Sequence, residues 1–182
     1  MKPLPTASTL LSPQCLEDLL LYQLARTVRV CGSMATRLVE GGFGITRREW
    51  GMVASLYGAG EITSSALAER LHLDRVRTSR ALQGLVKKGL VERRHGPQDR
   101  REVRVQLSDN GRQLYAELFP RIARLNTELL ADIAPAQVEV LLQCLQQLEA
   151  RGQALQQMGH VTDKADRRTG GAQRRRWAEP AV

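Results

Sequence analysis

Long apolar runs, paired cysteines and aromatic side chains are all scarce in this chain of 182 residues. No stretch is long and apolar enough to span a bilayer, and the opening segment MKPLPTASTLLSPQ lacks the apolar core of a signal peptide. We therefore expect a cytoplasmic protein that does not engage a membrane. The three cysteines, Cys15, Cys31 and Cys144, are widely spaced and odd in number, which excludes a disulfide framework and a zinc pattern.

Motifs for catalysis are also lacking. The histidines His72, His95 and His160 are scattered, and the sequence shows no nucleophile motif, no metal-ligand spacing and no glycine-rich phosphate loop. We expect neither an enzyme nor a bound cofactor or metal.

Positive charge is what the sequence has in excess. The formal net charge is +8 and the pI is about 10.1, which favours a polyanionic partner, either nucleic acid or an anionic membrane surface. Composition alone does not choose between the two. Leucine and alanine are abundant while aromatics make up only 4% of the chain, which favours helices.

Cap residues and hydrophobic periodicity predict a mainly α-helical fold with a small β-hairpin. Thr46 and Glu49 have the spacing of a capping box, and Pro120 inside a long helix predicts a kink rather than an end. The predicted elements are, in order, a helix over 16–40, a helix from Thr46 to Gly58 or Gly60, a short helix after Thr63, a helix from Asp74 to Lys88 closed by Gly89, strands over 90–95 and 102–107, a helix after Ser108 and a last helix from Pro135.

This order of elements is that of a winged helix-turn-helix lobe between long helices. The long helices have apolar stripes that one small lobe cannot cover, so an antiparallel helical homodimer is expected. The predicted organisation is an irregular arm over 1–14, dimerisation helices over 15–45 and 108–158, a DNA-binding lobe over 46–107 and a disordered basic tail over 159–182.

The helix from Asp74 to Lys88 has two different faces when its residues are placed about 100° apart. One arc holds Thr78, Leu82, Leu85 and Val86, and the opposite arc holds Arg77, Arg80, Gln83, Gly84 and Lys87. The second arc contains no acid, so it is not a solvated face laced with salt bridges. As the second helix of a helix-turn-helix it is expected in a major groove, where arginine can bond guanine and glutamine adenine. Gly84 would allow close approach to a DNA backbone.

The loop GPQDRREV, between the two predicted strands, carries Asp99, Arg100 and Arg101. Hydroxyl and amide groups at the start of the preceding short helix can donate to a phosphate. The predicted DNA-contacting residues are Thr63, Ser64, Ser65, Arg75, Arg77, Ser79, Arg80, Gln83, Lys87, Arg94, Asp99, Arg100 and Arg101.

The stretches ALAERLHLDRVRTSRALQGLVKKGLVERR and DRREVRVQLSDNGRQL resemble the MarR family of bacterial transcription regulators. The resemblance runs from about Thr46 to Leu114 and includes Asp99 and Arg101 as a D-x-R pair. It implies a homodimer that binds a pseudo-palindromic operator of double-stranded DNA, usually as a repressor. It also implies that Arg101 enters the minor groove and Asp99 supports the wing. Arg100 is the extra residue between them, for which we expect at most a phosphate contact.

The same resemblance implies a small aromatic or heteroaromatic acid as the effector that releases the DNA. A pocket for such an acid needs apolar walls and a cation, and the candidate residues are Tyr22, Arg26, Arg29, Trp50 and Tyr57. A redox-sensing regulator with Cys15 as its thiol is one alternative, although few basic groups surround that cysteine in the sequence. A sequence-independent architectural DNA-binding protein is the other.

Overall fold

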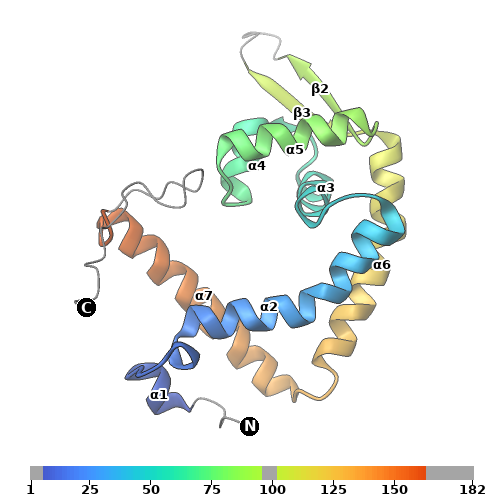
Figure 1. Ribbon diagram of the computed structural model, residues 1–182. Helices are drawn as coiled ribbons and strands as arrows, with labels where there is room; N and C mark the ends of the chain where they lie inside the picture. Colours follow the sequence, from blue (N-terminus) through green and yellow to red (C-terminus); the bar gives the residue numbers. More distant parts are fainter. Residues whose placement is uncertain (1–5, 96–101, 163–182) are drawn as a thin grey trace, which may run out of the picture. The chain divides into compact units, whose positions relative to one another are not determined.

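Helices form most of the structure, a computed structural model that describes residues 6–95 and 102–162 (Figure 1). The chain divides into two units, Met1–Leu129 and Leu130–Val182. In the first unit the elements are α1 (Ala7–Leu11), η1 (Leu16–Asp18), α2 (Leu20–Thr36), η2 (Arg37–Gly41), α3 (Arg47–Ala59), β1 (Ile62–Thr63), α4 (Ser64–Arg70), α5 (Arg75–Lys87), β2 (Val91–His95), β3 (Val103–Leu107) and α6 (Asp109–Leu130). The second unit contains α7 (Pro135–Gln157).

Local cap signals set most of the helix ends. The amide of Thr46 donates to Glu49 Oε2 at 2.7 Å and the amide of Glu49 donates to Thr46 Oγ1 at 3.2 Å, which confirms the predicted capping box of α3. Asp74 accepts from the amide of Arg77 at 2.8 Å at the start of α5. Gly89, with φ of 68°, follows the end of α5, a conformation that favours glycine.

The sheet has three antiparallel strands in the order β1-β3-β2. The hairpin pairs Val91 with Leu107 and Arg93 with Val105, so the apolar side chains of both strands share one face. That face packs on α3 and α5, and the hairpin lies next to α5 in Figure 1. The two-residue strand β1 was missed in the sequence, because it is defined by its pairing with β3 rather than by a periodic pattern.

The core of the first unit joins α3, α4, α5, the hairpin and the first half of α6. Its most buried large side chains are Ile45, Met52, Leu56, Leu67, Leu82, Leu85, Leu107 and Leu118. The buried position of Leu118 shows that α6 begins as part of this core before it extends beyond it. Pro120 does not end α6, as predicted.

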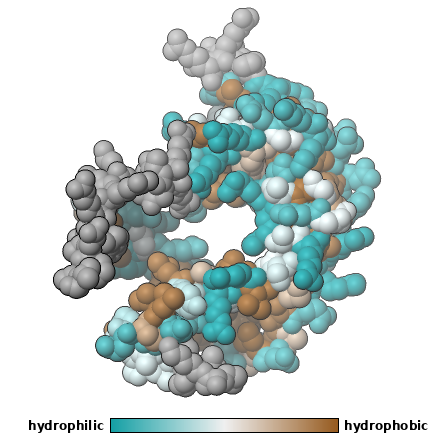
Figure 2. All heavy atoms as spheres, viewed as in Figure 1, coloured by the Kyte–Doolittle hydropathy of each residue, from teal (hydrophilic) through white to brown (hydrophobic). Residues whose placement is uncertain are grey.

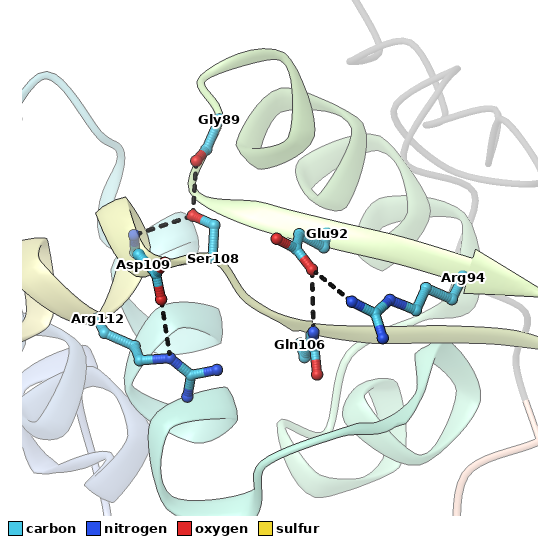
Figure 3. A network of polar contacts seen from close by, with 8 residues as sticks. Gly89, Glu92, Arg94, Gln106, Ser108, Asp109 and Arg112 are labelled. Carbon is cyan, nitrogen blue, oxygen red and sulfur yellow. Dashed lines mark hydrogen bonds and ion pairs between the residues drawn. The ribbon is translucent and has the colours of Figure 1, made fainter.

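The start of α6 depends on a glycine. A Cβ atom on Gly111 would lie 2.1 Å from the carbonyl oxygen of Leu90, which is backbone and cannot rotate away. Ser108 fixes the same junction, since its hydroxyl donates to the carbonyl of Gly89 at 2.6 Å and accepts from the amide of Gly111 at 3.1 Å (Figure 3). The glycine of the LSDNG motif is therefore required by close packing of α6 on the beginning of β2.

Two predictions for the N-terminal region need correction. The arm over 1–14 was expected to be irregular because of its prolines, yet α1 forms there with a capping box between Thr6 and Thr9. The predicted helix over 16–40 is divided into η1, α2 and the π-helical turn η2. None of the described helices is long and apolar enough to cross a membrane. The predicted tail over 159–182 lies outside the described residues from position 163 onwards.

Candidate nucleic-acid interface

Helix α5 presents one buried and one exposed face, as the helical wheel predicts. Thr78, Leu82 and Leu85 are at most 1% exposed and face the core. On the opposite side Arg80, Gln83 and Lys87 are exposed, and none of them has a hydrogen bond or ion pair within the described part of the chain. Hydrophilic residues cover most of the visible surface of α4 and α5 (Figure 2). These three side chains are therefore free to bind a partner.

The other predicted DNA-contacting residues on and beside α4 and α5 differ in their exposure and in the bonds they form within the protein. Arg77 forms an ion pair with Asp74 at 3.0 Å, so part of its charge is neutralised at the start of α5. Thr63 accepts from the amide of Ala66 at 3.1 Å as the cap of α4, and its hydroxyl proton remains available to a partner. Ser65 and Arg75 are exposed, whereas Ser64 and Ser79 are half-buried.

The role expected for Gly84 is wrong. Its missing side chain makes room for Glu49 of α3, because a Cβ atom there would lie 2.8 Å from Glu49 Oε1. The glycine therefore lets the carboxylate approach α5 from inside the protein, and it does not face a DNA backbone. The pattern on the wheel could not show this, since Glu49 is distant in the sequence.

Glu49 is a buried anion that ties α5 to the start of α3. Its Oε2 atom accepts from Lys88 Nζ at 2.8 Å and from the Thr46 amide, and Lys88 also donates to the carbonyl of Gly44 at 2.9 Å. Burial works to raise the pKa of Glu49, but the hydrogen bonds from Lys88 and Thr46 and the charge of Lys88 outweigh it and hold the pKa below its ordinary value. The end of α5 is thus anchored at a fixed place on the lobe.

A cavity of about 400 Å³ lies between the beginning of α3 and the exposed face of α5. Its lining residues are Thr46, Arg48, Glu49, Arg77, Arg80 and Ala81. Three guanidinium groups beside one carboxylate, itself satisfied by Lys88, suit an oxyanion such as a backbone phosphate. Sequence reasoning missed Arg48, because its position on α3 gives no sign that it meets the arginines of α5.

The adjacent arginines Arg93 and Arg94 of β2 lie on opposite faces of the hairpin. Arg94 pairs with Glu92 at 3.2 Å, and Glu92 also accepts from Gln106 at 2.9 Å (Figure 3). The hydrogen bond from Gln106, with the positive charge of Arg94, holds the pKa of Glu92 below its ordinary value. Arg93 lies on the other face opposite Val105, is exposed, and has no ion pair among the described residues. Arg93 is a second cation that the sequence prediction omitted.

The loop residues Asp99, Arg100 and Arg101 fall outside the described residues. The strand residues next to the loop are described, and there Arg104 donates to Glu102 at 2.6 Å and to Glu61 at 3.5 Å. The hydrogen bond and charge of Glu102 raise the pKa of Arg104. This guanidinium serves to join β1 and β3 rather than to meet a partner.

The predicted ligand residues are not brought together as a group. Trp50 and Tyr57 of α3 both stack on Tyr115 of α6, at ring-centroid distances of 5.5 and 3.8 Å. Tyr115, which the sequence prediction omitted, also stacks on Phe119 at 5.2 Å.

The three predicted ligand residues of α2 stand apart from this stack. Tyr22 is half-buried, Arg26 and Arg29 are exposed, and within the described residues no hydrogen bond, ion pair or ring contact joins them to Trp50 or Tyr57. Only the α3 half of the predicted pocket is therefore assembled in the single chain.

Cys15 has the wrong surroundings for a reactive thiol. Its Sγ atom donates to Asp18 Oδ2 at 3.3 Å, and this hydrogen bond to an anion, followed by that of Glu17, raises the pKa of the thiol. A raised pKa reduces the fraction of thiolate, which is the oxidisable form. Within residues 6–95 and 102–162 no three histidine, cysteine or acidic side chains are grouped as metal ligands.

A helix-turn-helix with an exposed cationic second helix, followed directly by a β-hairpin, defines a winged-helix DNA-binding protein. The profile described as "MarR family" matches residues 43–102. The HTH-type transcriptional regulator YdgJ of Bacillus subtilis is 31% identical over 126 residues, which cover 69% of this chain and 74% of that protein.

Solved structures agree with this class. A MarR family transcriptional regulator from Silicibacter pomeroyi has a TM-score of 0.63 and 26% identity, covering 73% of this chain and 89% of that one. A mutant of MarR from E. coli complexed with operator DNA has a TM-score of 0.61 and 26% identity, covering 70% of this chain and 94% of that one. The chain belongs to the MarR family, and it is a DNA-binding transcriptional regulator rather than an enzyme.

Proposed function

We propose that this regulator binds a pseudo-palindromic operator as a homodimer and represses transcription until a small aromatic or heteroaromatic acid releases it. The two faces of α5 are the observation that supports sequence recognition. Arg80, Gln83 and Lys87 are exposed and have no hydrogen bond or ion pair among the described residues, while Thr78, Leu82 and Leu85 on the other face are buried. A helix so anchored presents these side chains in a fixed orientation, which direct recognition of base edges requires.

Each basic residue has a proposed place on the DNA. Arg80 and Gln83 contact base edges in the major groove, where their side chains can form bidentate hydrogen bonds. Arg48 and Arg77 hold a phosphate in the cavity beside α5. The remaining proposed contacts are Thr63, Ser64, Ser65, Arg75, Ser79, Lys87, Arg93 and Arg94 to the DNA backbone, with Arg101 in the minor groove, Asp99 as support for the wing and Arg100 at a phosphate.

The dimer is supported by apolar surface that each unit leaves exposed. On α7 the exposed apolar side chains are Val140, Leu141, Leu142, Leu145 and Leu148, and on α2 they are Leu20, Leu21, Val28, Val30 and Met34. Hydrophobic residues gather along α2 in Figure 2. Exposed apolar side chains in this number are unfavourable in water, and burial against a second copy would remove many of them from it. Sedimentation velocity at micromolar concentration should give twice the monomer mass of 20.3 kDa.

DNase footprinting on a duplex that carries the selected operator tests the regulator itself. Protection of one inverted repeat, with half-sites about one helical turn apart, is the expected result. Uniform coverage of the duplex would instead indicate an architectural DNA-binding protein. For the redox alternative, Cys15→Ser should leave operator binding and its response to peroxide unchanged, since the hydrogen bond to Asp18 raises the pKa of the Cys15 thiol and so lowers its thiolate fraction.

A further inference from the structure

One exposed residue on the outer face of α5 has an apolar side chain. Val76 is 57% exposed, whereas the other exposed side chains of this helix are polar. Those other side chains belong to Arg75, Arg80, Gln83 and Lys87. Within the described residues, Val76 is not part of the core cluster on which the opposite face of α5 packs.

The stability of α5 gives no reason for a valine at this position. Branching at Cβ restricts the side chain in a helix, and valine has a lower helix propensity than arginine, lysine, glutamine or alanine. Because more than half of the surface of Val76 is in contact with water, the residue also contributes little hydrophobic stabilisation. A contact that forms only in a complex would account for the apolar side chain.

Val76 begins the same stripe as the side chains proposed to contact base edges. Spacings of four, three and four residues lead along α5 from Val76 to Arg80, Gln83 and Lys87. At about 100° per residue these four side chains fall within an arc of about 60°, opposite the buried face of the helix. Val76 is also the second residue of α5, and in helix-turn-helix proteins the N-terminal residues of this helix contact base edges.

The cations around Val76 favour DNA over another protein as the partner that covers it. Arg75 and Arg77 flank Val76 in the sequence, and Arg80 follows one turn later on the same side. A docking site for an apolar protein surface contains several neighbouring apolar side chains, whereas this valine lies among arginines. DNA suits both features, because its phosphates attract the arginines and its major groove contains one apolar group, the 5-methyl group of thymine.

We propose that Val76 is a specificity-determining residue that packs against the 5-methyl group of one thymine in each half-site of the operator. The inference rests on the proposed function, in which α5 lies in the major groove. The other bases present hydrogen-bond donors or acceptors there, which a valine would leave without a partner. Val76 and Arg80 are about 6 Å apart along the helix axis, and base pairs are about 3.4 Å apart, so the thymine lies within about two base pairs of the one that Arg80 contacts.

The test changes one methyl group at a time. In vitro selection with the full chain first supplies the operator, and each thymine of a half-site is then replaced by uracil, which lacks the methyl group but has the same hydrogen-bonding groups. Fluorescence anisotropy measures the affinity for each duplex. We expect one position at which uracil weakens binding about fourfold when it is placed in one half-site and about fifteenfold when it is placed in both.

A variant assigns this effect to Val76. In Val76→Ala the ratio of the affinities for thymine and uracil at that position should fall towards one, because the methyl groups that contact the base are gone. Alanine has the higher helix propensity, so the variant is expected to fold like the wild type, which circular dichroism and thermal unfolding check. Val161→Ala is the matched control, since it makes the same change at an exposed valine outside α5, and it should keep the wild-type ratio.

Methylated cytosine separates the methyl contact from hydrogen bonding. A pair of 5-methylcytosine with guanine carries a methyl group at the same place in the major groove, but it presents a donor where thymine presents an acceptor. At the identified position the wild type should bind the duplex with 5-methylcytosine about fourfold more tightly than the duplex with cytosine. Val76→Ala should bind the two duplexes equally.

The outcomes distinguish this inference from the proposed function. Selection of no common sequence would overturn the proposed function, and the role of Val76 with it. If an operator is selected, an absence of any uracil effect, or an effect that persists in Val76→Ala, would overturn the role of Val76 alone. A lower mass of Val76→Ala in sedimentation velocity, with an unchanged preference for thymine, would instead place Val76 in a protein interface.

Discussion

The ammonium group of Lys88 lies 2.8 Å from the carboxylate of Glu49, which is only 6% exposed. This pair joins the end of the recognition helix α5 to the capping box of α3. Gly84 provides the space for the carboxylate, and the carbonyl of Gly44 takes a further hydrogen bond from the same lysine. The orientation of the exposed cationic face of α5 thus depends on one buried anion and its single charged partner among the described residues.

Replacement of Lys88 by methionine should lower the free energy of unfolding by about 1–2 kcal/mol at neutral pH. Removal of one member of a buried pair leaves the other charge unpaired, and the loss is moderated here because Lys88 is 38% exposed. Urea denaturation measures the change. Lys87→Met is the control on the adjacent exposed residue, and an equal effect of both substitutions would contradict the role of the pair.

The stability difference between the wild type and Lys88→Met should shrink as the pH falls from about 7 to about 4. In the wild type the pKa of Glu49 is held below its ordinary value, so this carboxylate stabilises the fold above the unfolded pKa, and the contribution disappears as the pH falls through the folded pKa. In Lys88→Met the charge and hydrogen bond of the lysine no longer oppose the effect of burial on Glu49. The pKa of Glu49 is therefore higher than in the wild type, and its protonation at low pH favours the folded state. Denaturation curves at several pH values measure the difference, and a pH-independent difference would argue against this account.

Gly111→Ala should destabilise the protein by about 1–3 kcal/mol, because the new Cβ would meet the carbonyl oxygen of Leu90 and force the start of α6 away from β2. Gly51→Ala is the matched control within α3, where a Cβ has nothing within 4 Å. It should stabilise the protein by roughly 0.5–1 kcal/mol through helix propensity. Thermal unfolding of both variants checks the prediction, and a stabilising Gly111→Ala would refute it.

Much of the fold followed from local signals in the sequence. The cap residues Thr46, Asp74 and Gly89 act within one turn of their own helix, so their spacing alone predicts the helix ends. The parts that were missed depend on contacts between distant segments. Strand β1 exists through its pairing with β3, and the contact of Gly84 with Glu49 joins two helices.

In the candidate site, too, features set by local sequence could be predicted and those set by contacts between distant segments could not. The exposed face of α5 could be predicted because helical periodicity separates Arg80 from Leu82. Arg48 could not, since only the packing of α3 against α5 brings it beside Arg80. Tyr115 was overlooked for a similar reason, as it meets Trp50 and Tyr57 only once α6 packs on α3.

Arg48→Gln should weaken DNA binding almost equally for all sequences, since a phosphate contact carries no sequence information. The slope of log affinity against log salt concentration should become shallower by about 0.9 for the loss of one phosphate contact. Anisotropy titrations over a range of salt concentrations, on the operator and on a scrambled duplex, measure both quantities. A loss confined to the operator would instead place Arg48 at a base.

Arg80→Ala should cost about 1–3 kcal/mol on the operator and much less on the scrambled duplex, because a bidentate contact to a guanine is lost. The proposed homodimer should persist in this variant, since Arg80 lies on the exposed face of α5. Arg112→Ala serves as the control for the loss of one positive charge at a site away from this face. Equal losses on both duplexes would remove Arg80 from sequence recognition.

In vitro selection from random DNA duplexes tests the central claim most directly. The full chain should enrich an inverted repeat whose half-sites are centred about 10 base pairs apart, and Arg80→Ala should relax the preference at defined positions of each half-site. Enrichment of no common sequence, with binding that depends only on salt concentration, would contradict the claim that α5 reads an operator.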